Sequence, residues 1–186
     1  MEKHTTVRAV FSSFTGDARA ERFVLVTSAV PPNYVCHSCA PTIGMAVFSQ
    51  KGSNWTMDAF NRAVTYAGSW GQPPEDIQLV QVGPNRPAVE LRDVGGGQGE
   101  ATAVLELLIP WSGTVNLGLR RVVSDAYQCA EEDGGPPGPP CYANKRTLKF
   151  IPNGQAEYYD LELELTGTDL VAGNGTRMRA QKVHGL

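Results

Sequence analysis

The sequence predicts an all-β protein, mostly an antiparallel meander of hairpins with few or no helices. Short runs rich in β-branched residues or in alternating apolar residues recur along the chain. Turn residues such as Gly, Pro, Asn and Asp separate these runs about every 8 to 12 residues. The alternation of strands with long helices that marks a parallel α/β sheet is absent. The pattern fits a sandwich, a barrel or a set of propeller-like blades.

The first part of the chain divides into a leading segment and the start of the β domain. Residues 1–22 are expected to form an N-terminal segment, poorly ordered or a short helix, because the apolar residues of Thr5–Phe14 are irregularly spaced. A single β domain is expected over residues 23–186. Its first strand is Phe23–Ser28, which is apolar and rich in valine.

A hairpin is expected over Met45–Phe60, with its turn at Gln50–Ser53, where Gly52 supplies a positive φ. Ala59–Tyr66, which follows, is the second short helix candidate. The segment after it, Ala67–Gly71, reads A-G-S-W-G and approximates the nucleophile elbow of serine hydrolases. Pro73 and Pro74 forbid the helix that such an elbow requires, so the segment is interpreted as a tight loop.

The later strands are expected as successive hairpins. Thr102–Ile109 is the most hydrophobic run and is therefore the expected central strand, while Gly118 is a candidate β-bulge. The L-E-L-E-L run has the period of two that is typical of a half-buried strand. The other expected strands are Ile77–Val82, Ala88–Val94, Thr114–Ser124, Arg146–Ile151, Glu157–Leu165 and an edge strand at Thr176–Val183.

Composition argues against a nucleic-acid partner and against a membrane-spanning helix. The chain has 186 residues, of which 41% are hydrophobic, which is enough for one domain with its own core. The formal net charge of -3 argues against a nucleic-acid partner. No apolar run reaches the roughly 18 to 20 residues that a membrane-spanning helix needs, so no transmembrane segment is expected.

Four cysteines, at positions 36, 39, 129 and 141, form two sequence-local pairs. Cys129 and Cys141 flank a loop of Gly, Pro and acidic residues, and a disulfide there would contribute on the order of 3 kcal/mol. The even count favours an oxidising compartment, so a periplasmic or extracellular location is expected, with the signal peptide removed from this chain. Local pairs and pairs that cross between the two loops are both possible.

The segment C-H-S-C at Cys36–Cys39 raises the possibility of thiol-disulfide or metal chemistry. A redox C-x-x-C begins a helix directly after a strand, because the helix dipole lowers the pKa of the nucleophilic thiol. Here the following residues are apolar, contain Gly44 and lead into a hairpin. Zinc sites use two closely spaced ligand pairs, which the second cysteine pair does not provide. A structural disulfide is therefore favoured, with His37 left as a possible functional residue.

Three tryptophans, Trp55, Trp70 and Trp111, lie at or next to expected turns. Aromatic side chains at loop ends serve either as packing for the rim of the core or as contacts for a ligand. Rim packing is favoured here, and the three residues are also the candidate ligand-contacting aromatics.

The run V-C-H-S-C-A-P-x-x-G-x-x-x-F, with G-x-x-W, Q-V-G-P-N-R, a later C-Y and E-Y-Y-D-L, resembles an uncharacterised family of exported bacterial β-rich proteins. The resemblance covers roughly residues 23–168 and implies export but no activity. We therefore expect a non-catalytic binding or interaction module of the bacterial cell envelope, with structural disulfides. No catalytic residue, metal or cofactor is expected, and its partner would be an unidentified protein or small ligand. The alternatives are a thiol-disulfide or metal-dependent protein centred on C-H-S-C, and a purely structural accessory domain.

Overall fold

The computed structural model describes residues 4–14, 21–97, 99–127, 142–154, 156–167 and 178–183. Within these ranges the protein is all-β and antiparallel, as the sequence predicted, and none of them contains a helix that could span a membrane. The strands are β1 (His4–Phe14), β2 (Glu21–Val30), β3 (Thr42–Lys51), β4 (Asn54–Tyr66), β5 (Asp76–Gly83), β6 (Arg86–Gly97), β7 (Glu100–Trp111), β8 (Thr114–Tyr127), β9 (Tyr142–Ile151), β10 (Asp160–Gly167) and β11 (Met178–Val183).

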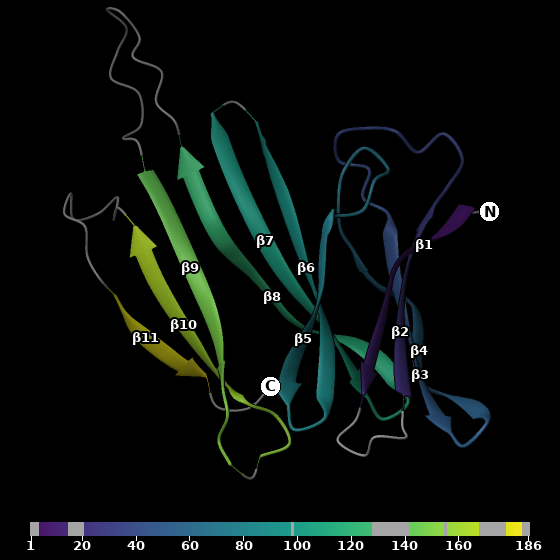
Figure 1. Cartoon of the computed structure of the whole chain (residues 1–186). Helices are drawn as coiled ribbons and strands as arrows, with labels where there is room; N and C mark the ends of the chain where they lie inside the picture. Colours follow the sequence, from purple (N-terminus) through teal and green to yellow (C-terminus); the bar gives the residue numbers. More distant parts are fainter. Residues whose placement is uncertain are drawn as a thin grey trace, which may run out of the picture.

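A four-stranded sheet forms in the order β1-β2-β3-β4 (Figure 1). The helix expected over Thr5–Phe14 was wrong, because β1 pairs antiparallel with β2 from His4 to Phe14. The helix expected over Ala59–Tyr66 was also wrong. There β4 is irregular: the three residues from Arg62 to Val64 lie opposite the single residue Gly44. The extra residues break the period of two, which explains why this strand did not look like one.

A second sheet has the order β11-β10-β9-β8-β7-β6-β5, so every strand pairs with its neighbour in sequence. The predicted hairpins are all present. β7 lies in the interior of this sheet, between β6 and β8, and Leu105 to Ile109 are all buried, as expected of a central strand. Gly118 is an extra residue of β8 between the pairs Leu107–Leu119 and Leu108–Leu117, which confirms the predicted bulge.

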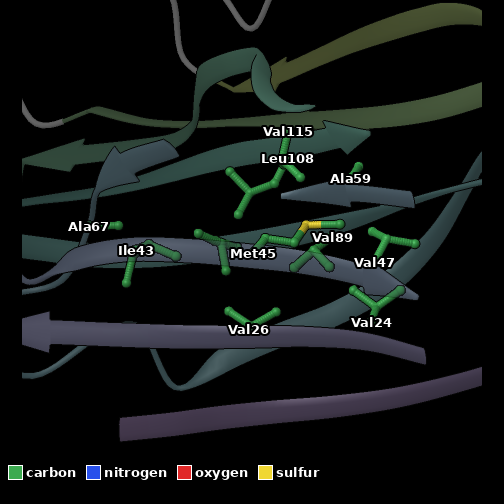
Figure 2. Packing of buried hydrophobic residues seen from close by; sticks show 11 residues of the cluster. Val24, Val26, Ile43, Met45, Val47, Ala59, Ala67, Val89, Leu108 and Val115 are labelled. Atoms are coloured by element: carbon green, nitrogen blue, oxygen red, sulfur yellow. The ribbon is translucent and has the colours of Figure 1, made fainter. Parts of the chain in front are cut away.

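The two sheets pack face to face over one core, to which both contribute (Figure 2). Val24, Val26 and Met45 come from the first sheet, and Val89 and Leu108 from the second. These are alternate residues of their strands, because side chains of a strand point to opposite faces in turn. This part of the molecule is therefore a β-sandwich.

The other face of the larger sheet carries a second core. Adjacent residues divide between the two: Val89 and Leu108 lie in the core between the sheets, whereas Ala88 and Leu107 lie in the second. The larger sheet curls around this second cluster (Figure 1). One end is closed because the backbone N–H of Tyr159, after β9, donates to the carbonyl of Val82 on β5 at 2.8 Å.

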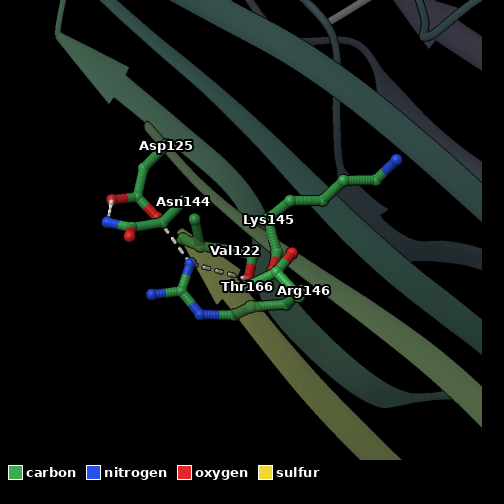
Figure 3. A network of polar contacts seen from close by, with 6 residues as sticks. All are labelled: Val122, Asp125, Asn144, Lys145, Arg146 and Thr166. Atoms are coloured by element: carbon green, nitrogen blue, oxygen red, sulfur yellow. Dashed lines mark hydrogen bonds and ion pairs between the residues drawn. The ribbon is translucent and has the colours of Figure 1, made fainter. Parts of the chain in front are cut away.

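β8 and β9 are hydrogen-bonded over only four pairs, from Ser124–Lys145 to Tyr127–Tyr142, and then diverge (Figure 1). A polar network ties the strands together at that point (Figure 3). Asp125 accepts hydrogen bonds from Asn144 at 3.0 Å and from Arg146 at 2.5 Å. Burial alone would raise the pKa of Asp125, but these hydrogen bonds and the Arg146 charge outweigh it and lower the pKa.

Candidate ligand-binding site

The C-H-S-C segment forms a disulfide, as predicted, and the bond joins Cys36 to Cys39, one of the pairings that the sequence left open. The bond closes a turn in which the Cys39 N–H donates to the Cys36 carbonyl at 2.9 Å. It excludes the two connectivities that would link the early and late loops. Cys129 and Cys141 lie outside the described residues, so their pairing stays a prediction. Metal ions and nucleophilic reactions require thiolates, which these two sulfurs do not offer while they are joined.

A second tight loop, Ser69–Gln72, is hydrogen-bonded to the disulfide turn and is called the clasp below. The N–H groups of Trp70 and Gly71 donate to the carbonyls of Cys36 and Cys39, at 3.0 and 2.7 Å. Ser69 and Gln72 exchange backbone hydrogen bonds, which confirms the tight loop predicted in place of a nucleophile elbow. The disulfide is therefore part of a backbone-bonded unit at one end of the molecule.

His37 lies in this unit, and its ring meets the ring of Trp70 edge-on, with centroids 5.6 Å apart. Both residues are exposed. The contact gives His37 a packing role, which the sequence did not suggest.

The three predicted tryptophans do not form one site. Trp55 packs against Phe23, Trp70 against His37 and Trp111 against Tyr158. All three remain between 43% and 52% exposed, so each is only partly used in packing. Trp111 lines a pocket with a largely apolar wall.

Trp111 ends β7, and the turn of Ser112 and Gly113, both with positive φ, sends the chain into β8. Its ring stacks on Tyr158, with centroids 5.5 Å apart and planes 25° apart. Tyr158 belongs to the segment between β9 and β10 that closes the curled sheet. The stack therefore joins two parts of the chain that are far apart in sequence.

A pocket of about 200 Å³ lies beside this stack. Its wall is almost entirely apolar and consists of Ile109, Trp111, Asn116, Gly118 and Tyr158. The bulge residue Gly118 packs closely against Ile109, since a Cβ atom there would overlap the side chain of Ile109. The divergence of β8 from β9 leaves the space uncovered by a neighbouring strand.

A second pocket, of about 130 Å³, shares Trp111 and Ile109 with the first. Its wall is more polar and includes Asp58, Asn85 and Arg86. Arg86 forms an ion pair with Glu157 and lies over the ring of Tyr158, 6.0 Å from its centroid. The two pockets together make Trp111 the centre of a surface that is apolar on one side and polar on the other.

Tyr158 is buried, and its hydroxyl has no hydrogen-bond partner among the described residues. Burial raises the pKa of Tyr158; the Arg86 charge opposes this effect and the Glu157 charge adds to it. The hydroxyl is therefore a proton donor at physiological pH that lacks an acceptor. Sequence analysis included Tyr158 in the expected strand Glu157–Leu165 but did not identify it as a site residue; in the structure it precedes β10, which begins at Asp160. The only signal was an aromatic pair, Tyr158-Tyr159, just before an alternating strand.

Comparisons with protein-family models, curated proteins and solved structures give no significant match. The resemblance of the C-H-S-C-A-P segment to an exported bacterial family therefore stays a prediction.

Proposed function

We propose that this protein is a non-catalytic binding module whose site is the apolar pocket beside Trp111 and Tyr158. The observation that carries the proposal is the pairing of a half-exposed aromatic stack with an open, ring-sized cavity. An apolar cavity of about 150 Å³ is enough to hold a benzene ring, and this one measures about 200 Å³. Concave, mainly apolar sites with a few polar groups are the usual form of ligand sites.

The wall composition selects the ligand. A sugar ring would bring several hydroxyl groups into a pocket that offers few polar atoms, and each unpaired group costs about 1–3 kcal/mol. An aromatic ring loses no such hydrogen bonds and gains stacking with Trp111. The proposed ligand group is thus an aromatic ring that carries few polar atoms, such as the ring of toluene or p-cresol.

The proposed setting is the bacterial cell envelope, periplasmic or extracellular. The Cys36–Cys39 disulfide supports it, since such bonds persist mainly in oxidising compartments. Mass spectrometry of the chain from its native source, with and without reductant, tests this proposal. Two disulfides account for a loss of four hydrogens, whereas free thiols would contradict the setting.

Binding is tested by NMR titration with p-cresol, toluene and D-glucose. We expect both p-cresol and toluene to bind, and glucose not to bind. Trp111→Ala should weaken p-cresol binding about five- to tenfold through loss of stacking. Trp55→Ala is the matched control, since Trp55 is 43% exposed and Trp111 46%. Tyr158→Phe keeps the ring that stacks on Trp111 and should leave the binding of both rings unchanged. The proposal fails if no ring binds, or if both tryptophan variants behave alike.

A second candidate function is thiol-disulfide exchange at Cys36. The observation that favours it is asymmetric exposure: Cys36 is exposed, while Cys39 is only 6% exposed. In the reduced state, the two thiols would give two electrons and two protons to a substrate disulfide as the Cys36–Cys39 bond re-forms. Insulin reduction with dithiothreitol as reductant discriminates between the candidates. A rate above that of dithiothreitol alone, lost in Cys36→Ser, would favour exchange over binding.

A further inference from the structure

On the side away from β7, β8 has a stretch of open backbone edge between the part that contacts β4 and the part that pairs with β9. On the side away from β7, only Ser124–Tyr127 pair with β9, and the start of the strand contacts β4. Within the described part of the chain, no strand pairs with residues 116–123 on that side. Most of these residues are exposed, with Leu119 half-buried and Val123 buried.

The hydrogen bonds around this edge show which backbone groups face outward. The carbonyl of Val115 accepts from the Asn61 side chain at 2.9 Å, and that of Val122 accepts from the Arg146 side chain at 3.5 Å. In an antiparallel strand the N–H and C=O of one residue point the same way, and the direction alternates along the chain. Arg120 therefore also presents its N–H and C=O at the open edge, two residues before Val122.

The open edge and the apolar pocket adjoin each other. Asn116 and Gly118 belong to both, and Tyr158 forms the far wall of the pocket. A strand added beside β8 would place one side chain about 5 Å from Gly118, on the pocket's face. The ring-sized space and the missing strand thus point to one occupant.

We infer that the ligand is an extended polypeptide segment that pairs with the open edge of β8 and inserts an aromatic side chain into the pocket over Gly118. The inference rests on the proposed function, because it assigns the ring to a peptide rather than to a free small molecule. Residues 116–123 span about 26 Å at strand geometry, which is room for a segment of up to eight residues. Main-chain pairing supplies affinity, and the pocket supplies selectivity for the aromatic residue.

The test compares p-cresol with the pentapeptide Ac-Thr-Val-Tyr-Val-Thr-NH2, which carries the same ring on a strand-forming backbone. We expect the peptide to bind at least about tenfold more tightly, because main-chain hydrogen bonds add to ring binding. N-methylation of the alternate amides that would face β8 should cancel this gain, because their hydrogen bonds are lost. N-methylation of the amides that face away from β8 should not. Replacing the tyrosine by alanine should weaken binding at least about tenfold, and Trp111→Ala in the protein should weaken it about five- to tenfold.

Each remaining outcome is decisive. If p-cresol binds but the peptide binds no better, or all N-methylated peptides bind equally, the peptide inference is overturned while the pocket proposal stands. If neither probe binds, both are overturned. Sedimentation of the protein without peptide measures its oligomeric state and so tests whether a second copy of this chain occupies the same edge. A dimer that Trp111→Ala dissociates would identify that copy as the occupant and overturn the inference of a separate peptide.

Discussion

At the scale of single residues, the least well-compensated group is Glu106 on β7. Its side chain is 2% exposed and lies between the two sheets, with one carboxylate oxygen 3.2 Å from Arg120 and the other without a partner among the described residues. Burial raises the pKa of Glu106; Thr65 and Arg120 oppose the effect and Asp93 adds to it. Burial thus costs the charged form more than its partners return.

The pH dependence follows from the direction of this shift. The pKa of Glu106 is higher in the folded than in the unfolded chain, so the folded state binds the proton more tightly. The resulting stabilisation is complete below the unfolded value of about 4.5 and is lost as the pH rises through the folded value. Glu106 should therefore make the protein less stable at neutral than at mildly acidic pH.

Glu106→Gln should raise the free energy of unfolding at pH 7 by about 1–2 kcal/mol, because a neutral amide replaces a poorly paired buried charge. It should change stability little at pH 4, where the wild-type carboxyl is already protonated. Urea unfolding at pH 4, 5.5 and 7 measures both effects. Glu75→Gln, at an exposed position, is the control and should change neither. Loss of stability in Glu106→Gln at pH 7 would mean that the Arg120 pair is net stabilising.

At the scale of elements, the disulfide turn and its clasp depend on close backbone contact. Gly71 has φ 72°, and a Cβ atom there would overlap the carbonyl oxygen of Tyr34. The position thus needs glycine both for its conformation and for its space. Gly52, in the β3–β4 turn, has a similar φ of 63° but nothing within 4 Å of an added Cβ.

Alanine variants at these two glycines distinguish the cost of backbone strain from the cost of steric overlap. Gly52→Ala should cost about 1 kcal/mol, the usual penalty for a side chain in the left-handed region. Gly71→Ala should cost roughly 3 kcal/mol, because overlap with Tyr34 adds to that penalty. Thermal unfolding of the two variants measures the difference. Equal losses would show that the clasp relaxes freely around a methyl group at position 71.

At the scale of the whole molecule, the strands were predictable because their apolar residues follow a period of two. The prediction failed where the period is interrupted, as at the irregular stretch Arg62–Val64 of β4. It also stopped short at Gly95–Gly97, which lie beyond the expected strand Ala88–Val94 but extend β6 in a long hairpin. Glycine carries no face preference, so pairing across the sheet decides its conformation rather than local sequence.

The candidate site was predictable in part. Trp111 and the bulge at Gly118 could be identified separately, since each has a local signature. Their proximity to Tyr158 could not, because it depends on how far the larger sheet curls and on where β9 leaves β8. Long-range geometry of this kind is set by the sum of many strand twists and bulges, which no short segment encodes.

The two cores raise the question of whether the sandwich and the curled sheet unfold together. Leu107 and Leu108 are adjacent, fully buried residues of β7, but Leu107 belongs to the curled-sheet core and Leu108 to the core between the sheets. Because β7 is shared, damage to either core should destabilise both. Leu107→Ala and Leu108→Ala should each cost about 2–5 kcal/mol and leave a single unfolding transition.

Single-tryptophan variants report on the two sheets separately. Trp55 lies on β4 in the smaller sheet and Trp111 on β7 in the larger one. Urea unfolding followed by the fluorescence of each retained tryptophan, and by circular dichroism, should give coincident midpoints in both leucine variants. If Leu107→Ala shifts only the Trp111 transition, the curled sheet is an independent unit. Coincidence would instead mean that the pocket beside Trp111 draws its rigidity from both cores, which would favour the proposed binding of an aromatic ring in one orientation.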